Sequence, residues 1–230
     1  MALITGGSRG IGLGIAAALS ATGVSVSITG RDARSLEAAQ RKLGSAALAV
    51  RADVQNEQDA ATAVDETVAR FGGLDILVNN AGVGVFAPVA DMTPAQWRQV
   101  LETNLHGVFY CCHAAIPHLR RRGGGWIINI SSLASKNPFA NAAAYCASKA
   151  GLNAFSEVLM QEVRHDNIRV SYILPGSVAT GFASRGEHGS ADWKLTPEDV
   201  AQVVVDLIAH PARSLPSRVE LRPSKPPIRG

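Results

Sequence analysis

Hydrophobic residues in this chain occur mostly in short continuous runs, and amphipathic segments with helical spacing fill the intervals. Most runs are continuous rather than alternating, which is typical of strands covered on both faces. The alternation of strand and helix predicts an α/β fold, with a doubly wound, seven-stranded parallel sheet flanked by helices on both faces. The predicted strands are Ala2–Thr5, Val24–Thr29, Ala46–Val50, Leu74–Asn79, Trp126–Ser131, Ile168–Leu174 and Arg218–Leu221.

Two helix starts are marked in the same way. The segments Thr93–Gln96 and Thr196–Asp199 each place a threonine at the N-cap and a proline at the first helical position, and Gln96 completes a capping box. The first helix is expected to be long and to end near Arg120–Arg122, whose cations suit a helix C-terminus. No repeat or linker divides the sequence, so we expect a single domain over residues 1–230.

Composition narrows the function. Hydrophobic residues make up 47% of the chain and charged residues 18%, and the net charge is +3, which is too weakly basic to indicate nucleic acid. Three cysteines without disulfide or zinc spacing favour the cytoplasm, and six histidines without ligand spacing predict no metal. No apolar run is long enough for a membrane span. A proline-rich basic tail is expected over about 222–230.

A glycine-rich loop follows the first strand. The run Thr5-Gly-Gly-Ser-Arg-Gly-Ile-Gly12 leads into an apolar helix from Leu13 to Leu19. Glycines in such a strand–turn–helix unit let the backbone approach a pyrophosphate, which the helix N-terminus attracts. A tight turn without a ligand is the alternative, but the position and flanks favour a Rossmann-type dinucleotide site.

The residues at the end of the second strand indicate which dinucleotide the protein binds. An NAD site usually has a carboxylate there, whereas a 2′-phosphate needs cations. Here the strand ends in Thr29-Gly30-Arg31, and Arg9 lies in the glycine loop. Two guanidinium groups without a carboxylate favour NADP(H) over NAD(H). The alternative is that Arg31 only caps the turn and Asp32 takes the role of the acid.

Tyr145 and Lys149 are four residues apart, and Ser132 precedes Tyr145 by thirteen residues. On a helix, Tyr145 and Lys149 share one face. A phenol normally loses its proton near pH ~10. An adjacent ammonium group is expected to lower the pKa of Tyr145 and so to suit it for acid–base chemistry near neutral pH. An ordinary solvated helix face is the alternative, which the upstream glycine loop disfavours.

These motifs together resemble the short-chain dehydrogenase/reductase family, in its shorter-subunit branch with TGxxxGxG and YxxxK motifs. The resemblance covers nearly the whole chain. Its other elements are Asn79-Asn80-Ala81-Gly82 after the fourth strand, Asn104, Ile130-Ser131-Ser132 after the fifth strand, and Pro175-Gly176 after the sixth.

The resemblance implies a role for each matching residue. Tyr145 would exchange a proton with the substrate oxygen, Ser132 would hydrogen-bond that oxygen, and Lys149 would bind the nicotinamide ribose. Asn104 would hold a water molecule in a proton relay. Ser131 is the rival for Ser132, and Asp53 could instead be a helix cap. The expected cofactor-binding residues are Gly6, Ser8, Arg9, Gly10, Ile11, Gly12, Arg31, Asp53, Val54, Asn80, Ala81, Gly82, Tyr145, Lys149, Pro175, Gly176, Val178 and Thr180.

The predicted function is therefore NADP(H)-dependent oxidoreduction of a small carbonyl or alcohol substrate, most simply the reduction of a ketone or aldehyde. One alternative is a 3-oxoacyl thioester reductase acting on an acyl carrier protein. Another is a non-catalytic dinucleotide-sensing protein, which intact catalytic residues disfavour. A short, polar substrate lid is expected over about 177–195. The resemblance implies a homodimer or homotetramer, although the last strand lacks the glycine-rich ending of many relatives.

Overall fold

The computed structural model describes residues 1–182 and 192–226. Its strands form one seven-stranded parallel sheet in the order β3-β2-β1-β4-β5-β6-β7, so the predicted fold class is confirmed. The strands are β1 (Ala2–Ile4), β2 (Val26–Gly30), β3 (Leu48–Arg51), β4 (Ile76–Asn79), β5 (Gly125–Ile130), β6 (Ile168–Pro175) and β7 (Arg218–Leu221).

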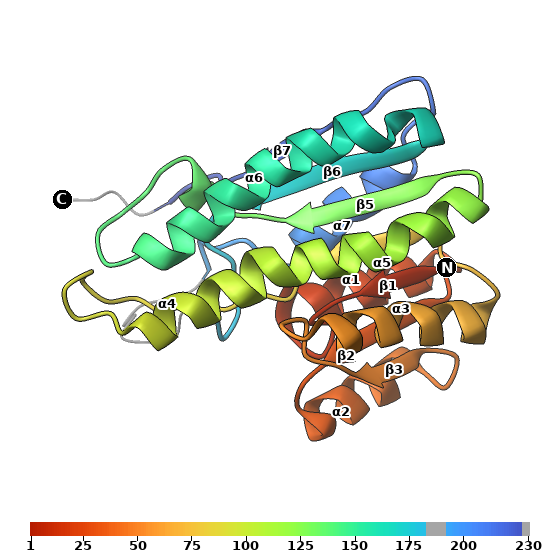
Figure 1. Cartoon of the computed structure of the whole chain (residues 1–230), viewed down its shortest axis with the longest axis horizontal. Helices are drawn as coiled ribbons and strands as arrows, with labels where there is room; N and C mark the ends of the chain where they lie inside the picture. Colours follow the sequence, from red (N-terminus) through yellow and green to blue (C-terminus); the bar gives the residue numbers. More distant parts are fainter. Residues whose placement is uncertain (183–191, 227–230) are drawn as a thin grey trace.

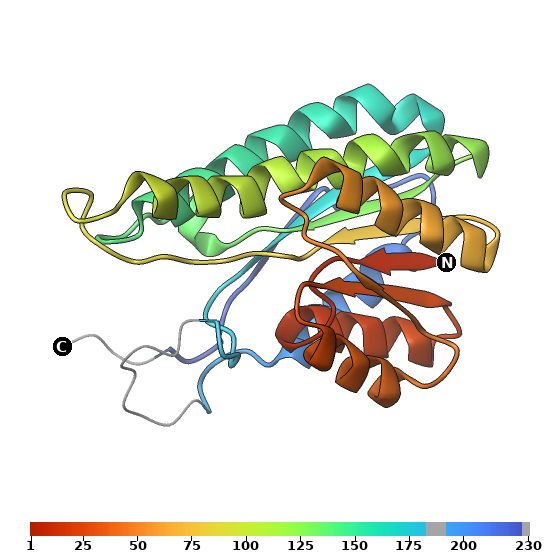
Figure 2. The same cartoon turned by 60° about the horizontal axis from the view of Figure 1, so that its bottom comes forward.

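Helices cover both faces of the sheet, as the views in Figures 1 and 2 show. One face carries α1 (Gly10–Ala21), α2 (Ala33–Leu43) and α7 (Pro197–Ile208). The other carries α3 (Glu57–Phe71), α4 (Pro94–Leu101), α5 (Gly107–Arg121) and α6 (Ala143–Val163).

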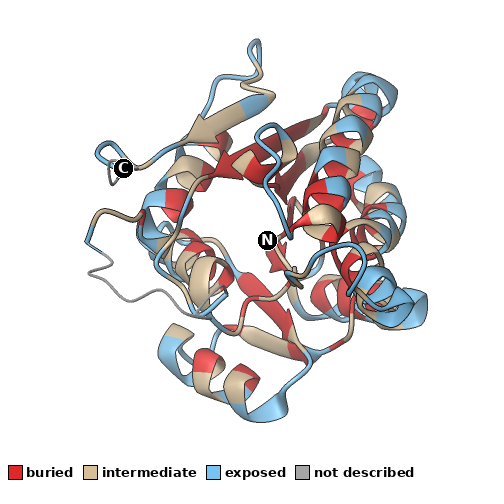
Figure 3. Cartoon of the chain, turned by 90° about the vertical axis from the view of Figure 1, so that its left-hand side faces the viewer, coloured by how far each residue is buried: buried red, intermediate tan, exposed pale blue. Residues whose placement is uncertain are grey.

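Strands β1, β4, β5 and β6 each supply side chains to two separate cores. In β4, Val78 packs into the core beneath α1 and α7, whereas Leu77 packs into the core beneath α3, α5 and α6. Successive side chains of a strand point to opposite faces, so both sets must be apolar. This two-sided burial explains the continuous hydrophobic runs in the sequence, and Figure 3 shows that buried residues concentrate in the strands and on the helix sides that face them.

Both marked helix starts are confirmed. Thr93 and Thr196 each accept a hydrogen bond from the third helical amide, and the side chain of Gln96 or Asp199 accepts one from the amide of the capping threonine. The first of these helices is not regular, however. A π-helical turn, η1 (Glu102–His106), separates α4 from α5, and the sequence pattern did not predict it.

The strand boundaries differ from expectation by a few residues. Val24 donates its amide to the Leu19 carbonyl in the turn after α1, so β2 begins two residues later than expected. In the same way Ala47 bonds back to Gly44 in a turn, and β3 begins at Leu48.

The carboxyl ends of the parallel strands meet at one edge of the sheet. Strands β1 to β3 are added toward one side of the sheet and strands β4 to β7 toward the other, so the strand order reverses between the adjacent strands β1 and β4. Ligands of doubly wound sheets bind in the crevice at such a point. The predicted lid begins beyond β6, where Val178 forms a bridge with Leu195. Its central part, 183–191, and the tail end, 227–230, lie outside the described residues. Within residues 1–182 and 192–226, none of the helices has the length and apolar character that a membrane span requires.

Candidate active site

Ser132 and Tyr145 converge at the carboxyl end of β5. Ser132 caps a short 3-10 turn, η2 (Leu133–Ser135), and its hydroxyl accepts a hydrogen bond from the Ala134 amide at 3.1 Å. Its hydroxyl also lies close enough to the phenol of Tyr145, in the first turn of α6, to lower the pKa of that phenol. The neighbouring Ser131 points the other way, and its Oγ donates to Asn153 Oδ1 at 2.6 Å. The serine that reaches Tyr145 is therefore Ser132.

Lys149 lies one helical turn after Tyr145 and is 4% exposed. Its Nζ donates a hydrogen bond to the Ile130 carbonyl at 2.8 Å, which fixes the ammonium group against the end of β5. Burial lowers the pKa of Lys149 to about 8, because the charged form loses its hydration. Lys149 therefore changes protonation close to neutral pH.

The expected lowering of the Tyr145 pKa is wrong for the protein without cofactor. Burial raises the pKa of the phenol above its ordinary value, and the nearby Ser132 hydroxyl only partly opposes this effect. The ammonium group that was expected to lower this pKa is directed to the Ile130 carbonyl. In this state Tyr145 is a neutral phenol, which is the form that donates a proton.

Asn104 is held in the π-helical turn, where it is fully buried. Its Oδ1 accepts from the Val83 amide at 2.8 Å, and its Nδ2 donates to the Val83 carbonyl at 2.9 Å and to Ser148 Oγ at 3.0 Å. Ser148 Oγ in turn donates to the carbonyl of Tyr145 at 2.8 Å. Asn104 thus joins the loop after β4 to the helix that carries Tyr145.

Gly82 lies between Asn104 and Lys149. A Cβ atom at this position would be 3.4 Å from Asn104 Oδ1 and 3.8 Å from Lys149 Nζ. Asn104 and Lys149, predicted as catalytic, and Gly82, predicted to bind the cofactor, therefore lie together although they come from three separate segments.

The glycine loop is tightly folded against the loop after β4. Gly6 and Gly10 have φ values of +62° and +52°, which favour glycine. A Cβ at Gly12 would lie 2.4 Å from both Asn80 Nδ2 and the Gly6 carbonyl. Asn80 donates its side-chain amide to the Thr5 carbonyl at 2.9 Å, which locks the two loops together.

The loop fits a dinucleotide pyrophosphate. Helix α1 starts after Arg9 without a side-chain cap and has no acidic residue in its first turn. Its first amide groups are consequently available to an anion. Thr180 flanks the loop, since a Cβ at Gly10 would lie 3.3 Å from Thr180 Cγ2. A bound dinucleotide would be held by these amides and by the loops after β4 and β6.

The two acidic residues near the carboxyl end of β2, Asp32 and Asp53, already have partners within the protein. Asp32 caps α2 and accepts hydrogen bonds from the Ser35 amide at 2.8 Å and hydroxyl at 2.5 Å. Asp53 lies 3.8 Å from the Arg31 guanidinium, and α3 is capped by Asn56 rather than by Asp53.

Other expected cofactor residues lie around the same edge of the sheet. Ser8 adjoins the end of β2, where a Cβ at Gly30 would lie 3.2 Å from its hydroxyl. Arg9 is exposed, whereas Ile11 and Val54 pack against the two cores. After β6, Gly176 donates its amide to Leu221 at 2.8 Å. The remaining expected residues, Ala81, Pro175 and Val178, lie in the loop after β4 and at or beyond the end of β6.

Sequence reasoning missed the aromatic surroundings of Tyr145. The Phe86 ring lies 5.9 Å from the Tyr145 ring, the Phe182 ring 5.7 Å from it, and Phe139 stacks on Phe86 at 6.2 Å. Nothing in the sequence relates these phenylalanines, because they come from three loops that meet only in the folded chain. Among the described residues, no group of three or more His, Cys, Asp or Glu side chains is placed to hold a metal ion.

Comparison with known proteins agrees with this geometry. The family model described as short chain dehydrogenase matches residues 1–190. A granaticin polyketide synthase putative ketoacyl reductase 2 from Streptomyces violaceoruber is 38% identical, over 90% of this chain and 89% of the relative.

Solved structures show the same similarity. A metagenomic short-chain oxidoreductase in complex with NADP has 37% identity and a TM-score of 0.85, covering 98% of this chain and 97% of the other. The 3-ketoacyl-(acyl-carrier-protein) reductase from Brucella melitensis, complexed with NADH, has 29% identity and a TM-score of 0.91, covering 97% and 96%. The chain is therefore an oxidoreductase that belongs to the short-chain dehydrogenase/reductase family.

Proposed function

We propose that this protein is an NADP(H)-dependent reductase of ketones or aldehydes. The observation that carries the proposal is the approach of the Ser132 hydroxyl to the Tyr145 phenol, close enough to lower the pKa of the phenol, one helical turn from the buried Lys149. A phenol and a hydroxyl that meet in this way can both address one substrate oxygen. Cellular NADPH usually drives reduction, which favours this direction over alcohol oxidation.

Each of the three residues has a distinct task. A reduced nicotinamide held at this site would supply the hydride for the carbonyl carbon. Tyr145 transfers its phenolic proton to the carbonyl oxygen as negative charge develops there, and the Ser132 hydroxyl donates a hydrogen bond to the same oxygen. Lys149, with a pKa of about 8, is suited to replacing the proton that Tyr145 gives up, and Asn104 positions the loop beside it.

The preference for NADPH over NADH rests on the charges around β2. The Asp32 carboxylate is occupied as the cap of α2, and the Arg31 side chain is half exposed. Arg9 and Arg31 are therefore the groups proposed to bind a 2′-phosphate. Replacing both by alanine should weaken NADPH binding about tenfold or more and leave NADH binding unchanged, as measured by nucleotide fluorescence. Equal losses for the two nucleotides would discard this assignment.

A 3-oxoacyl thioester reductase is the second candidate. It is favoured by the names of two relatives, the ketoacyl reductase from Streptomyces violaceoruber and the acyl-carrier-protein reductase from Brucella melitensis. An acetoacetyl thioester of a carrier protein, compared with a free ketone at equal concentration, distinguishes the two candidates.

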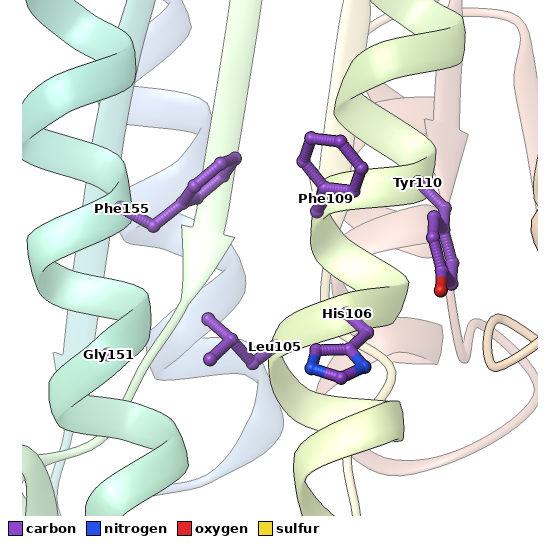
Figure 4. Close-up of a pocket in the computed structure, with 6 residues that line it drawn as sticks. All are labelled: Leu105, His106, Phe109, Tyr110, Gly151 and Phe155. Carbon is purple, nitrogen blue, oxygen red and sulfur yellow. The ribbon is translucent and has the colours of Figure 1, made fainter.

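A homodimer or homotetramer is also part of the proposal. An apolar groove of about 470 Å³ runs between α5 and α6 and is lined by Leu105, His106, Phe109, Tyr110, Gly151 and Phe155 (Figure 4). Phe109 and Val158, on the same two helices, are 49% and 53% exposed, which is typical of a surface covered by a partner. A second copy of the chain is the proposed occupant, and Phe109→Glu should convert the oligomer to monomer in light scattering.

The reducing activity is tested by NADPH oxidation with a panel of ketones, aldehydes and acetoacetyl thioesters. We expect the wild-type protein to oxidise NADPH with at least one of them. Tight NADPH binding without turnover of any compound would reject the proposal and favour a dinucleotide sensor. The three buried cysteines are all free, which suits the proposed cytoplasmic location.

A further inference from the structure

Three exposed phenylalanine rings gather around Tyr145. Phe86, Phe139 and Phe182 are 43%, 54% and 44% exposed, and ring contacts link all three to Tyr145 or to one another. Exposed apolar side chains that gather in this way mark a binding surface. Here that surface borders the phenol proposed to protonate the substrate.

The Tyr145 ring lies between two of these phenyl groups. The ring planes of Phe86 and Phe182 are tilted by 57° and 52° from the ring plane of Tyr145. Neither phenyl ring is therefore stacked flat on Tyr145. A Cβ at Gly84 would lie 2.9 Å from the Phe86 ring and 3.1 Å from the Phe182 ring. The two rings therefore converge over a glycine, which leaves room for both.

The backbone holds the first two rings in register. The Ala87 amide, next to Phe86, donates to the Asn141 carbonyl at 2.8 Å. This hydrogen bond ties the loop after β4 to the segment between η2 and α6, which carries Phe139. The stacked pair Phe86–Phe139, with 23° between planes, is thus part of a fixed wall.

An aromatic wall fits two kinds of ligand, a flat aromatic group or an ammonium cation. The buried amine of Lys149, one turn from Tyr145, repels a second cation at the reacting end. Among the described residues, the rings that contact a cation are Phe71, Trp126 and Trp193, and none of these belongs to the wall of Phe86, Phe139 and Phe182. The uncharged aromatic group is the better match.

We propose that Phe86, Phe139 and Phe182 select carbonyl substrates that carry an aromatic ring next to the carbonyl group. The inference rests on the proposed reductase function. With the carbonyl oxygen at Tyr145 and Ser132, the ring attached to the carbonyl carbon packs against the phenyl wall. The aryl group then contributes offset or edge-to-face contacts that a saturated ring of equal size does not make.

The test compares acetophenone with cyclohexyl methyl ketone, which has the same number of carbon atoms but no aromatic ring. Conjugation makes acetophenone the less reactive ketone toward hydride, so a preference for it must come from the protein. We expect kcat/KM to be higher for acetophenone in the wild type. A higher value for cyclohexyl methyl ketone, or for a trimethylammonium ketone, overturns the inference while leaving the reductase function intact.

Leucine substitutions separate aromatic contact from apolar bulk. Phe86→Leu and Phe182→Leu should each lower the acetophenone preference about threefold, and the double variant about tenfold, since one aromatic pair is lost per site. The control Phe71→Leu, at the end of α3, should leave the preference unchanged. An unchanged preference in the double variant overturns the inference.

A binding measurement provides a readout independent of turnover. In saturation-transfer NMR on the cofactor-free protein, the ring protons of acetophenone should receive more saturation than its methyl protons. The difference should vanish in Phe86→Leu/Phe182→Leu and persist in Phe71→Leu. Equal transfer in all three proteins counts against the aromatic wall, whereas failure of every ketone to be reduced by NADPH-loaded protein rejects the proposed function itself.

Discussion

Lys149 should reveal its burial through the pH dependence of stability. Its pKa is about 8 in the folded protein without cofactor, against an ordinary value of 10.5. Below pH 8 both states are protonated, and the folded state bears the full cost of a buried charge. This cost corresponds to about 3 kcal/mol of unfolding free energy.

The sign of the effect follows from proton binding. Between pH 8 and 10.5 the folded state has lost the proton while the unfolded state still holds it, so the Lys149 contribution to stability rises with pH. The slope is about 1.4 kcal/mol per pH unit. Lys149→Met removes the charge and has no such slope. It also leaves the Ile130 carbonyl without its donor, which adds a constant, pH-independent cost.

The assay is urea unfolding of cofactor-free wild type and Lys149→Met at pH 7.5, 8.5 and 9.5, at one protein concentration. We expect the wild type to gain stability relative to the variant by about 2 kcal/mol over this range. Burial also raises the pKa of Cys111 to about 12 and that of Cys112 further. Both thiols are present in both proteins, so their effects cancel. A difference that stays flat with pH would refute the burial argument for Lys149.

Three further changes test other parts of the site. Gly12→Ala places a methyl group 2.4 Å from the Gly6 carbonyl, so it should abolish the NADPH fluorescence change; wild-type affinity would contradict the tight loop. Thr93→Ala removes a capping box and should cost about 1 kcal/mol in urea unfolding without altering NADPH affinity; no loss of stability would show that the cap is dispensable. Asn104→Leu removes three side-chain hydrogen bonds and should lower kcat at least about tenfold with little change in NADPH affinity. An unchanged kcat would remove Asn104 from the relay.

Local sequence patterns were enough to predict the sheet, the glycine loop and the helix caps. Val78 and Leu77 are both apolar because each side of the sheet is covered, so the run is readable without its neighbours. Thr93 and Thr196 bond within their own first turns. Ser131 and Ser132 have different partners, since adjacent residues at a strand end point in opposite directions, and Ser132 as the catalytic serine stays a prediction.

Features that depend on distant segments were not readable. The π-helical turn at Glu102–His106 places Asn104 against Val83, and that contact crosses to the loop after β4. The direction of the Tyr145 pKa shift depends on burial by surrounding elements and on Lys149 pointing to Ile130. The phenyl wall is likewise assembled from three loops that only the parallel sheet brings to one edge.

Replacement of Tyr145 by phenylalanine tests the proposed chemistry most directly. The variant removes one oxygen atom, and its NADPH affinity serves as the control for folding and cofactor binding. With the best carbonyl substrate of the panel, Tyr145→Phe should oxidise NADPH at least about a hundredfold more slowly than the wild type, because the proton donor is gone. NADPH oxidation by Tyr145→Phe at the wild-type rate would contradict the assignment of Tyr145 as the group that protonates the substrate.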